Sequence, residues 1–168
     1  MLKRLFAFIL LLLGVHESPA EILQGRCSYV QDGDSLKFIP QGKEKGDEVR
    51  VRLYGIDAPE KNQEFSGQSR KKLEKLTRGK KIRLEVMDID QYDRYVARVY
   101  VGKTYVNLEM LKAGLAWHYD YHADDKADAE LAKAEAAARK ARKGLWSDDS
   151  VVNPREHRRV NGTVHSNR

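Results

Sequence analysis

Cysteine is nearly absent from the sequence, and so are long apolar runs. Cys27 is the single cysteine among 168 residues, so no disulfide can form within the chain. A lone thiol could join two chains, but a small thiol in an apolar strand is more often buried, and we assign Cys27 no role. The length allows one domain with a real core and does not comfortably allow two.

The one extended apolar run lies at the start of the chain. Residues 5–15 are almost wholly apolar, follow a basic start and precede a Ser-Pro-Ala sequence. The run is shorter than the roughly 20 residues that a membrane-spanning helix needs. The pattern predicts a secretory signal peptide at residues 1–20, cleaved after Ala20, with an uncleaved anchor as the alternative. We therefore expect an exported protein, periplasmic or secreted, without stable membrane association after cleavage.

Charge of either sign is not in large excess. The formal net charge is +6, and removal of residues 1–20 takes away two basic side chains and one acidic side chain, which leaves +5. An exported basic protein suggests an anionic partner, either nucleic acid or an anionic surface. The excess is too small for charge alone to decide between these partners.

Alternating apolar residues predict five strands, at residues 23–30, 35–39, 48–56, 80–88 and 95–100. The first two strands are joined by a tight Asp-Gly turn. Three helices are predicted: one capped by Ser66, a short one capped by Asn107, and one capped by Asp124 or Asp125 that runs to residue 143.

This order of elements predicts an α+β fold, a five-stranded Greek-key barrel of the OB type with about three α-helices. Another α+β arrangement is the alternative. The barrel domain is expected to cover residues 21–147. Residues 148–168 form a polar, basic tail that is expected to be disordered.

Charged residues cluster where the third strand ends. Arg52 lies within the strand, and Asp57 and Glu60 follow it around Pro59. Cutting a phosphodiester requires a cation near the phosphate, donors for the charge that builds on its oxygens, and a base for the water. Two carboxylates near an arginine therefore suggest a site that handles a metal and a phosphate. Solvated turn carboxylates are the alternative.

Five short motifs together carry a family resemblance. They are DGDS at 32–35, RLYGIDAPE at 52–60, DQYDR at 90–94, VNLEMLKAGLAW at 106–117 and GLW at 144–146. In this order and spacing they resemble the staphylococcal nuclease (thermonuclease) family over about residues 25–146. No single motif would suffice, because Asp-Gly-Asp alone is a common turn.

The resemblance implies roles for eight residues. Ca²⁺ would be held by Asp34, Asp57 and the backbone carbonyl of Ala58. Arg52 and Arg94 match the phosphate-binding arginines, which suit phosphate because a guanidinium binds it bidentately. Glu60 matches the candidate general base, although orienting the water or supporting the metal remain alternatives. Tyr119 and Tyr121 resemble the pair that stacks on the nucleotide base, with core or rim tyrosines as the alternative.

Asp93 and a loop that contains two histidines lead to two further expectations. Asp93 stands before Arg94 where the family usually has glycine, so a carboxylate there is expected to compete for the arginine and to strain a left-handed turn. His118 and His122, with Asp120 and Asp124, suggest a zinc site, but their loop has no matching partner elsewhere in the sequence.

The implied function is a monomeric, calcium-dependent endonuclease that cleaves DNA and RNA with little sequence preference. By resemblance it would prefer single-stranded or frayed substrates and leave 3′-phosphate ends. One alternative is a non-catalytic OB-fold module that binds single-stranded nucleic acid, and another is a surface protein that holds anionic polymers. Neither alternative needs Asp34, Asp57 and Glu60 together.

Overall fold

The computed structural model describes residues 21–120 and 126–165, and the predicted signal peptide lies outside them. The strands are β1 (Glu21–Val30), β2 (Ser35–Pro40), β3 (Val49–Leu53), β4 (Ile56–Asp57), β5 (Lys81–Ile89), β6 (Tyr95–Val101), β7 (Thr104–Tyr105) and β8 (Trp117–His118). The helices are α1 (Ser66–Thr77), α2 (Val106–Lys112), α3 (Lys126–Lys140), the 3₁₀ turn η1 (Gly144–Ser147) and α4 (Pro154–His165).

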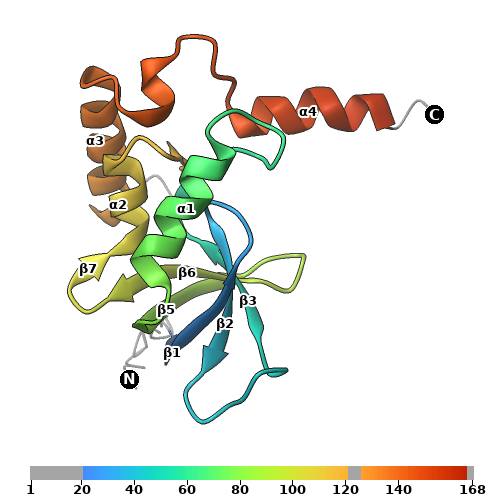
Figure 1. Cartoon of the computed structure of the whole chain (residues 1–168), viewed down its shortest axis with the longest axis vertical. Helices are drawn as coiled ribbons and strands as arrows, with labels where there is room; N and C mark the ends of the chain where they lie inside the picture. Colours follow the sequence, from blue (N-terminus) through green and yellow to red (C-terminus); the bar gives the residue numbers. More distant parts are fainter. Residues whose placement is uncertain (1–20, 121–125, 166–168) are drawn as a thin grey trace, which may run out of the picture.

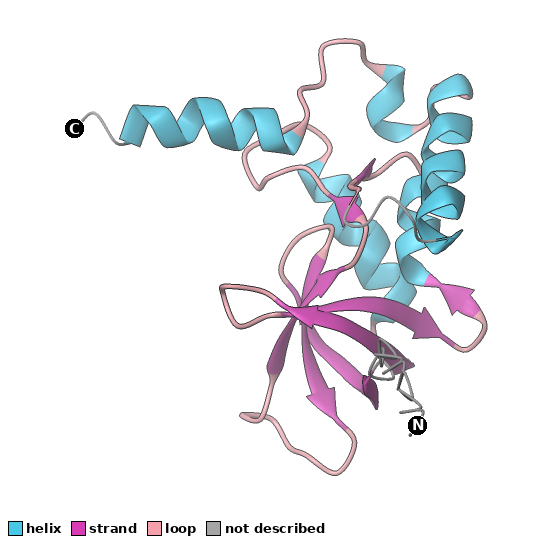
Figure 2. Cartoon of the chain, turned by 180° about the vertical axis from the view of Figure 1, so that it is seen from behind, coloured by secondary structure: helices cyan, strands magenta, loops and turns pink. Residues whose placement is uncertain are grey.

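Five strands close into a barrel. Antiparallel pairing gives the order β3-β2-β1-β5-β6, and a parallel pairing of β3 with β6 closes the ring (Figures 1 and 2). The inward side chains form the core, among them Phe38, Val51, Leu84 and Val99, each fully buried. The predicted α+β fold with an OB-type barrel is confirmed.

The predicted strand at residues 48–56 is broken in the structure. β3 ends at Leu53, and Gly55 takes a positive φ of 70°, a conformation that favours glycine. The chain then forms the short strand β4, which pairs with β8 in a separate two-stranded sheet (Figure 2). This break in the strand places Asp57 at the end of the barrel, where Asp34 also lies.

The helices form a layer beside the barrel, with α3 packed on α2 (Figure 1). Two predicted caps are wrong. Ser66 is the first residue of α1, whose N-cap is Phe65, and Asn107 lies inside α2, where it is fully buried. The predicted cap at Asp124 or Asp125 lies outside the described residues.

The prediction of a disordered tail is wrong for residues 154–165, which form α4. The side chain of Asn153 accepts a hydrogen bond from the Arg155 amide at 2.9 Å, and Pro154 is the first helical residue. An asparagine cap followed by proline is a common helix start, because proline lacks the amide that would be unpaired there. α4 projects to one side of the helical layer (Figure 1).

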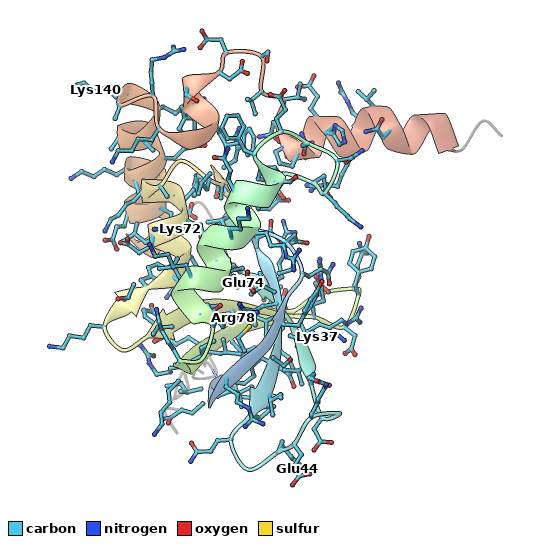
Figure 3. All side chains as sticks on the ribbon, in the orientation of Figure 1. Lys37, Glu44, Lys72, Glu74, Arg78 and Lys140 are labelled. Carbon is cyan, nitrogen blue, oxygen red and sulfur yellow. The ribbon has the colours of Figure 1, made fainter. Side chains whose placement is uncertain are left out.

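Charged side chains cover the outside of the molecule. Figure 3 shows Lys37 on the barrel, Glu44 in the β2–β3 turn and Lys140 on α3, all pointing outward. In the part of the chain that the structure describes, no helix is long and apolar enough to cross a membrane.

Candidate active site at the end of the barrel

The DGDS turn brings Asp34 against Ala58, the residue that follows β4. Gly33 is required because a Cβ there would lie 1.8 Å from the Ser69 hydroxyl oxygen of α1. The Ser35 hydroxyl donates to one carboxylate oxygen of Asp34 at 2.8 Å, and the Ala58 amide donates to the other at 2.6 Å. The Asp34 carboxylate is thereby fixed in orientation, next to Ala58.

Arg52 bridges the two buried aspartates. Its Nη1 lies 3.0 Å from an Asp34 oxygen and its Nη2 lies 2.7 Å from Oδ1 of Asp57. Both aspartates are only 2% exposed. Burial raises the pKa of Asp34 to about 7, although the Arg52 charge opposes this rise. The Arg52 charge therefore does not fully offset the cost of burying the Asp34 carboxylate.

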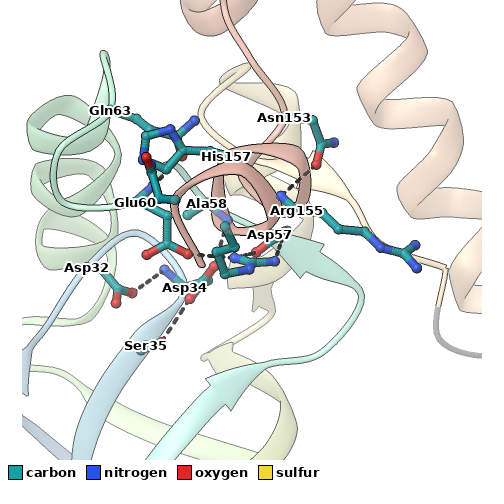
Figure 4. A network of polar contacts seen from close by, with 12 residues as sticks. Asp32, Asp34, Ser35, Asp57, Ala58, Glu60, Gln63, Asn153, Arg155 and His157 are labelled. Atoms are coloured by element: carbon teal, nitrogen blue, oxygen red, sulfur yellow. Dashed lines mark hydrogen bonds and ion pairs between the residues drawn. The ribbon is translucent and has the colours of Figure 1, made fainter. Parts of the chain in front are cut away.

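Glu60 stands at the rim of this pair, just past Pro59. Its amide donates to the side-chain oxygen of Gln63 at 2.8 Å, and its own side chain is 38% exposed. Figure 4 shows Asp34, Asp57 and Glu60 on the same side of the barrel end. A carboxylate that is half open to solvent beside two buried ones is well placed to reach a water molecule.

Arg94 is held by Asp90, four residues earlier in the chain. The Nε and Nη2 atoms of Arg94 each lie 2.7 Å from Oδ2 of Asp90. Asp93 does adopt the expected left-handed conformation, with a φ of 57°. The Asp93 carboxylate was expected to compete with phosphate for Arg94. Among the described contacts, the carboxylate that binds Arg94 is instead that of Asp90.

Sequence reasoning missed Arg158 of α4. Its Nη2 lies 2.7 Å from Oδ2 of Asp57, and its Nη1 lies 3.1 Å from Oδ1 of Asp57 and 2.6 Å from Glu60. The hydrogen bond to Asp57 holds the pKa of this guanidinium above its usual value. The Asn153-Pro154 helix start was the signal in the sequence that could have drawn attention to this segment.

A hollow of about 470 Å³ opens over these groups. Its lining includes Arg52, Glu60, Arg94, Tyr119 and Arg158. Tyr119 is therefore brought to the site, whereas Tyr121 lies outside the described residues. Another hollow, of about 500 Å³, lies on β1 and β5 and holds none of the predicted site residues.

The donor set fits a hard cation. Asp34 and Asp57 supply buried carboxylate oxygens, and the cations that now bind those oxygens are guanidinium groups. Within residues 21–120 and 126–165, no three His, Cys, Asp or Glu side chains are grouped to hold a metal.

The suggested zinc site gains no support from the part that is described. His118 bonds to Asp128 of α3, with 2.9 Å between its Nε2 and the carboxylate oxygen. His122 and Asp124 lie outside the described residues.

These features define a class of protein: an OB-type barrel whose open end carries buried carboxylates, arginines and an aromatic side chain. The sequence model described as Staphylococcal nuclease homologue matches residues 50–148. The chain belongs to this family. The match ends before α4 begins at Pro154.

Three relatives show the range of similarity. An uncharacterized endonuclease of Haemophilus influenzae is 38% identical over 130 residues, which cover 77% of this chain and 70% of that protein. A micrococcal nuclease of Shigella flexneri is 32% identical over 146 residues, covering 82% and 81%. A probable staphylococcal-like nuclease of Oryza sativa is 40% identical over 110 residues, which cover 66% of this chain but only 29% of that protein.

Proposed function

We propose that this protein is a nuclease that hydrolyses phosphodiester bonds of DNA and RNA, with Ca²⁺ held by Asp34, Asp57 and the backbone carbonyl of Ala58. The observation that carries the proposal is the buried Asp34–Arg52–Asp57 cluster with Glu60 at its rim. Membership of the staphylococcal nuclease family and relatives named as nucleases support it.

The residues divide the chemistry between them. Asp34, Asp57 and the Ala58 carbonyl would hold the metal, and a bound Ca²⁺ would supply positive charge beside the phosphate and favour ionisation of a water molecule. Glu60 accepts the proton of the water that attacks phosphorus. Arg52 and Arg94 donate hydrogen bonds to the phosphate oxygens as negative charge builds on them.

The leaving group decides the product ends. The bond between phosphorus and the 5′-oxygen breaks, Arg94 donates a hydrogen bond to the departing oxygen, and the phosphate remains on the 3′ end. Asp90 binds the Nε and Nη2 atoms of Arg94 and therefore competes with the phosphate for these donors.

Substrate binding is proposed to depend on phosphate and on stacking rather than on base edges. Tyr119 lines the hollow and offers a ring to a base, and Tyr121 is proposed as its partner. Stacking tolerates any base and needs an unpaired one. We therefore expect little sequence preference and better cleavage of single-stranded or frayed substrates.

The setting of the activity is also part of the proposal. The apolar run at residues 5–15 favours export, to the periplasm or the medium, with no stable membrane association after cleavage. We expect the mature protein to act as a monomer.

A plasmid-nicking assay with Glu60→Gln tests the function. The substitution keeps the shape of the side chain but removes the base, and we expect kcat to fall by about 10²- to 10⁴-fold. The matched control is Glu44→Gln, which removes the same charge from an exposed turn far from the site (Figure 3). Thermal unfolding of both variants checks that the fold is kept.

Each assay condition addresses one part of the proposal. If nicking is absent with Ca²⁺ present in the unchanged protein, hydrolysis is excluded and a binding module remains. If nicking survives EDTA, the metal assignment fails while hydrolysis stands. If Glu60→Gln cleaves as fast as Glu44→Gln, Glu60 is not the base.

A further inference from the structure

We infer that α4 is an intramolecular cap on the active site, in which Arg158 occupies the position of the catalytic cation and must leave when a metal binds. This inference rests on the proposed function, because it concerns the same carboxylates. It concerns a segment that begins after the residues matched by the family model end.

Both carboxylate oxygens of Asp57 accept hydrogen bonds from guanidinium groups. Oδ1 of Asp57 accepts bonds from Arg52 and Arg158, and Oδ2 lies 2.7 Å from Nη2 of Arg158. The same guanidinium also binds Glu60, the proposed base. A metal cation at Asp57 would lie beside the positive charge of Arg158, so the guanidinium competes with the metal for this carboxylate.

Arg158 is the guanidinium that can leave. Arg52 belongs to β3 within the barrel, and its side chain is only 20% exposed. Arg158 belongs to a helix outside the barrel, and its side chain is 42% exposed. Withdrawal of Arg158 moves α4 alone, whereas withdrawal of Arg52 would disturb the barrel.

The other side-chain contacts described between this segment and the barrel domain are polar. The Gln63 amide donates to the Val152 carbonyl at 2.9 Å, and His157 lies 3.1 Å from the side-chain oxygen of Asn62. Pro154 is buried at the start of α4, but Val152 and Val160 are 44% and 55% exposed, so the apolar anchoring lies at the first turn of the helix. Polar contacts of this kind contribute little individually and open readily.

A short linker keeps the cap close to the site. Residues 148–153 connect η1 to α4, so a released helix stays at high effective concentration near Asp57. The cap and the metal then compete for one carboxylate. Because binding free energies are reciprocal, the metal weakens docking of α4 as much as α4 weakens metal binding.

The test compares Arg158→Ala with Arg155→Ala in the full chain. Both remove one arginine from α4, but Arg155 points away from Asp57 and Glu60 (Figure 4). Calorimetric titration with CaCl₂ should show roughly tenfold tighter binding to Arg158→Ala than to the unchanged protein, within the usual range for coupled sites. Arg155→Ala should bind within about twofold of the unchanged protein, by the same measure of coupling.

Hydrogen exchange separates displacement from a simple change of local charge. In the unchanged protein, saturating Ca²⁺ should speed the exchange of the amides of residues 156–161, because α4 undocks. A variant that ends at residue 153 should bind Ca²⁺ as Arg158→Ala does, and its thermal unfolding reports whether it folds.

The outcomes distinguish the cap from the function. Equal or weaker Ca²⁺ binding by Arg158→Ala overturns the cap and leaves the nuclease proposal standing. Tighter binding without faster exchange in α4 also overturns the cap, since charge alone then explains the gain. Absence of Ca²⁺ binding in every protein overturns the cap and the metal assignment together.

Discussion

At the scale of the residue, one carboxylate, that of Asp90, both positions and restrains Arg94. Asp90 accepts bonds from the Arg94 side chain and from the Arg94 amide, the latter at 3.1 Å. The Tyr92 amide also donates to Asp90 at 2.9 Å. One carboxylate therefore shapes the whole 90–94 loop, and the position of Arg94 depends on it.

Replacing Asp90 with asparagine should destabilise the protein in a pH-dependent way. Burial pushes the pKa of Asp90 upward, but its hydrogen bonds with Arg94 outweigh this and lower the pKa below its ordinary value of 3.8. A lowered pKa means that the stabilisation is present above pH 3.8 and is lost as the pH falls through the folded-state value. We expect Asp90→Asn to cost about 1 kcal/mol at pH 7, since solvent screens a loop near the surface.

Urea unfolding at several pH values measures this effect. The difference in free energy of unfolding between the two proteins should be constant from pH 7 to about pH 5 and should shrink below pH 4. A difference that persists unchanged at pH 3 would mean that the ionic contact is not its source.

At the scale of elements, the sequence predicted the barrel better than its junctions. Alternation identifies strands because a side chain points to the core at every second residue, and the predicted bounds agree with β2, β5 and β6 to within a residue or two. It could not show the break at Gly55, because a glycine within a strand can also mark a bulge or a close contact. The α4 docking was missed because Arg158 and Asp57 lie 101 residues apart.

Asn107 illustrates a role that a pattern cannot reveal. An asparagine before a helix predicts a cap, but here its side chain accepts from the Val99 amide at 3.0 Å and donates to the Tyr54 carbonyl at 2.8 Å. It thereby joins α2 to β6 and to the end of β3, just before the chain turns toward Asp57. The pairing depends on tertiary structure, so the local sequence carries no sign of it.

Asn107→Ala should therefore destabilise the junction strongly. The substitution leaves buried backbone groups of Val99 and Tyr54 without partners, and each such group costs about 1–3 kcal/mol. We expect a loss of about 2–5 kcal/mol in the free energy of unfolding. Denaturant unfolding measures it, with Gln68→Ala on the exposed face of α1 as a control that should stay within about 0.5 kcal/mol.

At the scale of the molecule, a close backbone contact joins Gly114, after α2, to Gly144 and Leu145, after α3. The Leu145 amide donates to the Gly114 carbonyl at 2.8 Å, and Leu145 is fully buried. A Cβ on Gly144 would lie 2.3 Å from that carbonyl oxygen. The two tryptophans, Trp117 and Trp146, meet edge to face beside this contact, with ring centres 5.3 Å apart. Tryptophan fluorescence thus reports on the contact between β8 and η1 beside the helical layer, while far-UV circular dichroism reports on the whole chain.

Gly144→Ala tests whether this layer and the barrel unfold as one unit. Gly144 and Gly42 both have positive φ values, 52° and 82°, but nothing lies within 4 Å of a Cβ built on Gly42. Gly42→Ala should cost only the backbone strain, about 1 kcal/mol, whereas Gly144→Ala should cost about 2–4 kcal/mol because a close backbone contact must also open. Since α2 and α3 share one core with the barrel strands, fluorescence and circular dichroism should give the same midpoint in each variant. An earlier fluorescence transition in Gly144→Ala would show instead that the helical layer unfolds separately and that the barrel stands without it.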